Sequence, residues 1–169
     1  MKPRKLSLRE GLVYTAIILL GIGLDQLTKW LAVRFLAPVD TVPLIKDVLH
    51  LTYVENRGAA FGMLADDRWV FLVASSVLIA VLIPYLYLGL AEGRLASVSV
   101  AMIVAGGIGN MIDRLTLGYV VDFIDVRLIH FAVFNGADSF VCVGACLLAL
   151  SLVRAIIGEY KDKKKKNGA

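Results

Sequence analysis

The sequence predicts a membrane all-α fold with four transmembrane helices and a small extracytoplasmic β-sheet and loop subdomain. Hydrophobic residues make up 59% of the 169 residues and the mean hydropathy is +0.77, whereas soluble domains contain roughly 45–50% apolar residues. A helix needs about 20 residues to cross a bilayer core of about 30 Å. Four apolar segments approach that length, at about residues 11–30, 69–91, 95–112 and 137–157, within a single integral membrane domain over residues 1–169.

Basic residues crowd both ends of the chain and predict its orientation. Four of them precede residue 10, and Lys163–Lys166 follow the last span. Because Lys and Arg are enriched on cytoplasmic flanks, both termini are expected in the cytoplasm, and the connections 31–68 and 115–136 on the outer side. The lysine tail lacks the interleaved aromatic residues that stack on bases, so nucleic-acid binding is not expected.

The outer connections show strand-like patterns. Val48–Val54 alternates apolar and polar residues, and Tyr119–Val126 and Leu128–Phe134 are rich in β-branched and aromatic residues. These patterns are typical of short strands. They predict a small sheet that rests on the membrane.

The histidines and cysteines do not indicate a metal site. His50 and His130 lie in the strand-like segments and are expected at a surface or an interface, because two histidines without ligand spacing do not make a metal site. Cys142 and Cys146 lie in an apolar stretch without ligand-type partners, so they are expected to pack in the core. No metal and no other cofactor is expected.

Asp25 and Lys29 place charge inside the first span. An ionisable side chain costs about 2.5–3.5 kcal/mol at the bilayer centre and less near the ends of a span. Counted by helix rise from the cytoplasmic start of the span, Asp25 lies about 21 Å up, in the outer third of the core. Lys29 follows at i+4 and can pair with it. A structural ion pair at a helix end would explain both residues.

The third span carries polar residues on one face. Gly106, Asn110, Asp113 and Arg114 recur at i, i+4, i+7 and i+8. Because this span starts at the cytoplasmic turn, Asn110 and Asp113 reach the outer side at about the depth of Asp25. Glycines at 106, 107 and 109 would let another backbone approach closely. From this stretch alone, polar packing between helices explains the pattern as well as a functional site does.

Asn135 and Asp138 open the fourth span. As N-cap and third helical residue, they would satisfy the first amides of the helix and its dipole. That role explains Asp138 but not Asp122, which has apolar neighbours on both sides. Asp125 is the nearby charge expected to be solvated.

The connection between spans three and four can fold Asp122 back beside Asp138. Two carboxylates a few ångströms apart in a low dielectric cannot both ionise easily, so the pair can hold one proton near neutral pH. One carboxylate then activates a water and the other protonates a carbonyl oxygen or a leaving amine. No Ser/His/Asp group, Ser-Lys dyad or Cys/His pair offers a better catalytic set. A small transporter and a non-enzymatic assembly protein are the alternatives, since intramembrane Asp and Arg also mark ion paths.

Four motifs resemble those of the bacterial lipoprotein signal peptidases, also called signal peptidase II or prolipoprotein signal peptidases. They are LDQLTKW in the first span, ENRGAAFGML in the outer connection, GGIGNMIDRLTLGYVVDFIDV after the third span and FNGADSFVCVG at the opening of the fourth. The resemblance covers essentially the whole chain, and the last two motifs together are highly specific.

The resemblance implies an intramembrane aspartic endopeptidase of the bacterial inner membrane, with its site near the outer face. Such enzymes remove the signal peptide from diacylglyceryl-modified prolipoproteins, cutting before the lipidated cysteine. The resemblance assigns the catalytic pair to Asp122 and Asp138, substrate or inhibitor binding to Asn56, Asn110, Arg114 and Asn135, and support of the site to Asp25, Lys29, Gly58 and Asp113. Expected partners are the lipidated substrate, membrane lipid and globomycin-type inhibitors, with the chain a monomer. The glycines beside Phe61 and Met63 indicate a flap that closes over the substrate.

Overall fold

The computed structural model describes residues 4–58 and 68–167. In chain order its elements are α1 (Leu8–Leu31), the π-helical η1 (Ala32–Leu36), β1 (Thr41–Ile45), β2 (Leu49–Asn56), α2 (Arg68–Tyr87), α3 (Gly93–Thr116), β3 (Val120–Val126), the 3-10 helix η3 (Arg127–Ile129) and α4 (Gly136–Asn167). Within these residues, four helices are long and apolar enough to cross a membrane, and the strands form one antiparallel sheet. The predicted fold class is confirmed.

The helix ends differ from the predicted spans, and at α3 the difference begins with its polar residues. α3 continues past residue 112 to Thr116, so Asp113 and Arg114 are helical, whereas α2 ends at Tyr87 rather than at residue 91. Hydropathy alone stops a span at its first charges, although the helical hydrogen bonds continue through them. Phe61 and Met63 of the predicted flap lie outside the described residues.

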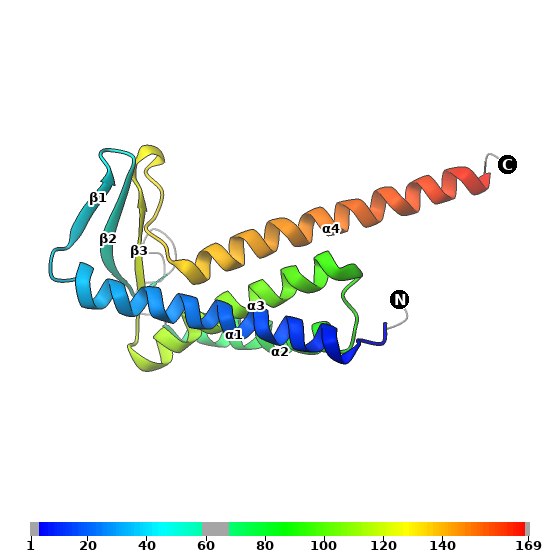
Figure 1. Cartoon of the computed structure of the whole chain (residues 1–169), viewed down its shortest axis with the longest axis horizontal. Coiled ribbons are helices and arrows are strands. Elements are labelled where there is room, and N and C mark those ends of the chain that lie inside the picture. The colour runs from blue at the N-terminus through cyan, green and yellow to red at the C-terminus, as the bar shows by residue number, and fades with distance from the viewer. Residues whose placement is uncertain (1–3, 59–67, 168–169) are drawn as a thin grey trace.

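Figure 1 shows the sheet at one end of the helices and both chain termini at the other end. α3 packs against α1, α2 and α4 and is the most buried of the four helices. Its Val100 and Val104 form a core with Tyr14 and Ile18 of α1 and Leu86 of α2. α3 therefore carries its last turn, with its polar residues, to the end of the bundle that bears the sheet.

Small residues let the helices approach at that end. A Cβ on Gly109 would lie 2.5 Å from Asp25 Oδ2, and one on Gly106 would overlap the carbonyl oxygen of Ala137. The predicted close approach of another backbone is confirmed at Gly106, whereas the close neighbours of Gly109 are the side chains of Asp25 and Ala137. A Cβ on Gly107 would make only ordinary contact with Ile79, at 3.5 Å.

The sheet has the order β1-β2-β3 and follows the C-terminal end of α1 through η1. Ala32 and Leu36 of η1 pack against Val121 of β3 in a second, smaller core. The register between β2 and β3 shifts between Leu51 and Val54, so that Val54 faces Asp122 across the ladder. Such an irregularity re-aims side chains within a strand.

The predicted strand at Leu128–Phe134 is wrong. η3 occupies 127–129, and His130 follows in the left-handed region with φ 50°. Phe134 then returns to form an isolated bridge with Ile124. The turn brings the chain back along β3 and delivers Asn135 beside Asp122. His130 itself is exposed, as expected.

Four side chains differ in burial from what the sequence predicts. Cys142 and Cys146 are exposed on α4 instead of packed in the core, because α4 is covered mainly along the side that meets α3. His50 is buried, at 7% exposure. Asp125 is also buried, and its carboxylate accepts from the Arg127 guanidinium at 2.8 Å and from the Thr52 hydroxyl at 2.7 Å.

Gly106→Ala is expected to destabilise the contact between α3 and α4. The new Cβ would overlap the Ala137 carbonyl oxygen and lie 2.8 Å from Val141 Cγ2, and overpacking costs about 1–3 kcal/mol. Gly23→Ala is the matched control, because a Cβ there meets nothing within 4 Å. Thermal unfolding in one detergent measures both. Equal midpoints for the two variants would contradict this packing.

Candidate active site

Asp122 is a buried carboxylate on β3, at 1% exposure. Its Oδ2 accepts a hydrogen bond from Asn56 Nδ2 at 2.8 Å and its Oδ1 accepts one from Asn135 Nδ2 at 2.7 Å. Burial raises the pKa of Asp122 to about 6, and the charge of Asp138 adds to the rise. The two amide donors oppose the rise because they stabilise the ionised form. Asp122 therefore changes its charge close to neutral pH.

Asp138 is the third residue of α4 and forms a reciprocal cap with Asn135. The Asp138 backbone N–H donates to Asn135 Oδ1 at 2.9 Å, and the Asn135 backbone N–H donates to Asp138 Oδ2 at 3.2 Å. This confirms the predicted capping box. The other carboxylate oxygen, Oδ1, accepts from Asn110 Nδ2 at 2.7 Å.

Asn135 joins the two aspartates. It is fully buried, and it donates its side-chain amide to Asp122 and its backbone amide to Asp138. One residue thus holds both carboxylates in the same small region, as the sequence predicted for Asp122 and Asp138. The link depends on the turn before α4, because that turn sets Asn135 beside β3.

Lys29 fixes the orientation of Asn110. Its ammonium has donors and no acceptor, and it donates to Asn110 Oδ1 at 2.8 Å. Asn135 Nδ2 donates to the same oxygen at 3.1 Å. The Asn110 amide must therefore present its nitrogen, and not its oxygen, to Asp138.

The same ammonium lies between two more buried carboxylates. Lys29 Nζ is 2.9 Å from Asp25 Oδ2 and 3.0 Å from Asp113 Oδ2. Asp25 also accepts the Ala137 backbone N–H at 2.7 Å, and Asp113 accepts the Val121 backbone N–H at 3.1 Å. Each supporting carboxylate therefore holds the amide of the residue that directly precedes a site aspartate.

Arg114 and Gly58 complete the predicted set. The Arg114 guanidinium lies over the Phe71 ring, 5.0 Å from its centroid. It also interacts electrostatically with the carboxylates of Asp138 and Asp122. Its Nη1 donates to the Asn110 carbonyl oxygen at 3.4 Å. The Gly58 backbone N–H donates to Asn56 Oδ1 at 3.0 Å, which turns the Asn56 amide nitrogen toward Asp122.

Every predicted site residue thus belongs to one connected network: Asp25, Lys29, Asn56, Gly58, Asn110, Asp113, Arg114, Asp122, Asn135 and Asp138. The sequence reasoning missed two contributors, Gln26 and Phe71. Gln26 lies inside the LDQLTKW motif, which is the signal that could have found it. Phe71 has no such signal, because an aromatic residue in an apolar span is ordinary.

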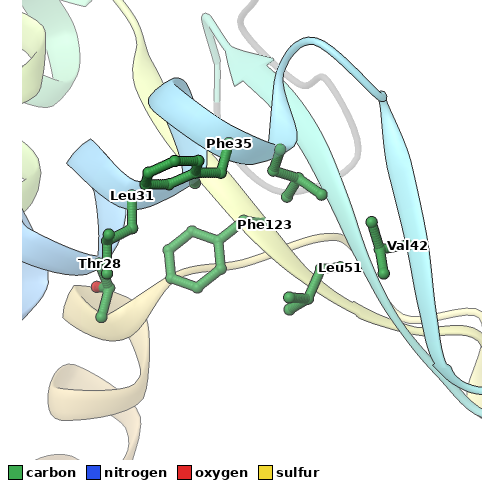
Figure 2. Close-up of a pocket in the computed structure, with 8 residues that line it drawn as sticks. Thr28, Leu31, Phe35, Val42, Leu51 and Phe123 are labelled. Carbon is green, nitrogen blue, oxygen red and sulfur yellow. The ribbon is translucent and has the colours of Figure 1, made fainter.

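A separate apolar pocket of about 330 Å³ lies between the C-terminal end of α1, with η1, and the sheet. Figure 2 shows Phe123 and Leu51 of the sheet facing Thr28, Leu31 and Phe35 across it. The Thr28 hydroxyl donates to main-chain carbonyls of its own helix. The residues that line the pocket therefore offer apolar contact and no carboxylate, imidazole or amine for proton transfer.

Comparison with known proteins decides the family. The family described as Signal peptidase (SPase) II matches residues 17–154, which include every site residue named above. The chain belongs to the signal peptidase II family. Family membership makes it a peptidase, a hydrolase of a bacterial membrane with several membrane-spanning helices.

Individual relatives agree with this assignment. A lipoprotein signal peptidase of Caldanaerobacter subterraneus is 47% identical over 137 residues, covering 81% of this chain and 93% of the relative. A lipoprotein signal peptidase of Clostridioides difficile is 46% identical over 143 residues, covering 82% of this chain and 93% of the relative. A solved bacterial membrane enzyme superposes with a TM-score of 0.75 at 29% identity, covering 84% of this chain and 88% of its own.

Lys29→Met is expected to lower the free energy of unfolding by about 3–5 kcal/mol, because it leaves buried carboxylates without their counter-charge. Lys46→Met is the matched control, since it removes the same charge from an exposed position and is expected to cost less than about 0.5 kcal/mol. Thermal and denaturant unfolding in one detergent compare the two. A cost for Lys29→Met as small as that for Lys46→Met would show that the buried ion group is not needed for folding.

Proposed function

We propose that this signal peptidase is an intramembrane aspartic endopeptidase, with Asp122 and Asp138 as its catalytic pair. The observation that carries the proposal is the double role of Asn135, which hydrogen-bonds both carboxylates from one buried residue. A second support is the pKa of Asp122, which burial raises to about 6. A pair that carries one proton can act as base and acid in the same reaction.

In the proposed reaction the ionised carboxylate takes a proton from a water, and the water oxygen bonds to the scissile carbonyl carbon. The protonated carboxyl gives its proton to the carbonyl oxygen. The tetrahedral intermediate then collapses: the C–N bond breaks, and the leaving amine receives the proton that came from the water. One hydroxyl of the intermediate returns its proton to the carboxylate that had acted as the acid, so the C=O bond re-forms and the pair again holds one proton. Asn56, Asn110, Asn135 and Arg114 would bind and orient the substrate main chain, with the Arg114 guanidinium polarising the carbonyl.

The substrate we infer is a diacylglyceryl-modified prolipoprotein, cut immediately before its lipidated cysteine. The relatives named lipoprotein signal peptidase support the lipoprotein part of this assignment. Exposed apolar side chains surround the described helices, so a signal helix and its acyl chains could reach the site by diffusion within the bilayer. Membrane lipid and globomycin-type inhibitors would share this approach.

We further infer one integral membrane peptidase domain, active as a monomer in the bacterial inner membrane. The basic residues at both termini favour a cytoplasmic location for that end of the bundle. The sheet and the carboxylate network lie at the opposite end, which would place the site near the outer face. A transporter would instead be expected to carry charges near the middle of its spans.

Asp122→Asn and Asp138→Asn are each expected to abolish cleavage of a diacylglyceryl-modified prolipoprotein, because each removes one half of the acid–base pair. Asp125→Asn is the matched control on the same strand, and it is expected to retain activity since Asp125 pairs with Arg127. Gel-shift assays with purified, folded variants measure the cleavage, and globomycin should block it in the active enzymes. Near-normal turnover by either dyad variant would disprove the assignment.

The pH dependence of cleavage should follow the pKa of Asp122. Below about pH 6 the pair holds a proton, and above it that acid is lost, so kcat should fall on the alkaline side. Asn56→Leu removes a hydrogen bond that lowers this pKa, so the alkaline midpoint should move to higher pH even where the maximum rate drops. A midpoint for Asn56→Leu at or below that of the unmodified enzyme would contradict this role.

A further inference from the structure

We propose that Gln26 is a positioning residue for the reaction, which sets the distance between the two catalytic aspartates through Asp25 and Asp113. The proposal rests on the proposed function above for its kinetic part. Its structural part concerns only how β3 and α4 are held relative to each other. Gln26 lies in the LDQLTKW segment, and within the described residues it makes no hydrogen bond to Asp122 or Asp138.

The side-chain amide of Gln26 joins the two supporting carboxylates. Its Nε2 donates to Asp113 Oδ1 at 2.9 Å, and lies 3.3 Å from Asp25 Oδ2 and 3.2 Å from the Gly109 carbonyl oxygen. Asp25 and Gln26 are on α1, whereas Asp113 and Gly109 are on α3. The amide thus clamps these helices together at the point where a Cβ on Gly109 would lie 2.5 Å from Asp25 Oδ2.

The excess of buried negative charge in this group explains why the Gln26 amide is needed. The group contains two buried carboxylates, at 1% and 2% exposure, and a single ammonium, that of Lys29. Asp113 Oδ2 already accepts both Lys29 and the Val121 amide. Gln26 is the donor to the remaining oxygen, Oδ1, in the part of the chain that the structure describes. Without Gln26, Asp113 Oδ1 would be buried without a hydrogen-bond donor, which is costly. The Asp113 side chain would then be expected to rotate toward another donor.

A movement of Asp113 would be transmitted to the catalytic pair. Asp113 holds the Val121 amide, one residue before Asp122, and Asp25 holds the Ala137 amide, one residue before Asp138. Gln26 contacts both supporting carboxylates, so it controls the relative position of β3 and the start of α4. It would therefore act on kcat, through the geometry of the pair, rather than on substrate affinity.

The test compares Gln26→Met with Leu27→Met in the full chain. Met matches the length of Gln and has no donor, while Leu27 is the exposed neighbour on the same helix. In Gln26→Met, kcat for the lipidated prolipoprotein is expected to fall about 10- to 100-fold, with KM changed less than about twofold. Hydrogen exchange of the backbone peptide over residues 119–126 should become faster. Leu27→Met should change neither quantity.

Hydrogen exchange does not require catalysis, so it separates the two proposals. If the unmodified protein fails to cleave but Gln26→Met still loosens residues 119–126, the proposed function fails and the structural part of the clamp stands. Unchanged exchange at 119–126, or an unchanged kcat per folded molecule, overturns the proposal. Should Gln26→Met not fold, Gln26→Asn serves instead, since its shorter amide cannot reach Asp113 and the same outcomes apply.

A double variant checks that Gln26 acts through Asp113. Asp113→Asn combined with Gln26→Met is expected to lose no more kcat than Asp113→Asn alone, because residues that act through one another are not additive. Losses that multiply independently would mean that Gln26 reaches the site by another route, and would overturn the proposal.

Discussion

The structure depends on one buried ammonium held between two carboxylates that belong to different helices. Lys29 and Asp25 lie on α1 and Asp113 lies on α3, and all three side chains are almost fully removed from solvent. Breaking such a group leaves a buried charge without a partner, which is far more costly than losing an exposed ion pair. The relative position of these helices is therefore strongly fixed at this level of the bundle.

The position of the proposed catalytic pair follows from this constraint. Strand β3 begins just after the chain leaves α3, and α4 begins where the chain re-enters the bundle. Val121 and Ala137 are buried at these points, so their backbone amides need acceptors within the protein. Asp113 and Asp25 provide those acceptors at Val121 and Ala137. The ion group thus serves two purposes with the same atoms, since it joins α1 to α3 and it also anchors the two segments that carry Asp122 and Asp138.

Much of this arrangement is predictable from the sequence because it depends on local spacing. The i+4 pair of Asp25 and Lys29 and the capping relation of Asn135 and Asp138 need only a helix and a count of residues. The bonds from supporting carboxylates to backbone amides are not predictable in this way, because they join residues of different elements. The prediction for Asp125 is wrong for a related reason: its carboxylate is covered by the Thr52 hydroxyl of the neighbouring strand and by the Arg127 guanidinium, and a hydropathy pattern contains neither contact.

Asn110 allows Lys29 to orient the proposed pair, Asp122 and Asp138, without direct contact between the ammonium and either carboxylate. An ammonium in direct contact with a carboxylate strongly favours the charged form, which would remove the proton that the proposed mechanism needs. Here the neutral Asn110 amide stands between Lys29 and Asp138, and transmits orientation while keeping the full charge one residue away. Asp122 is separated from Lys29 by two amides, because Asn110 Oδ1 accepts from both Lys29 and Asn135, and Asn135 donates to Asp122. Burial is therefore the largest influence on the pKa of Asp122, and the charge of Lys29 lowers that pKa less than burial raises it. The network can therefore be rigid and still leave the pair able to share a proton.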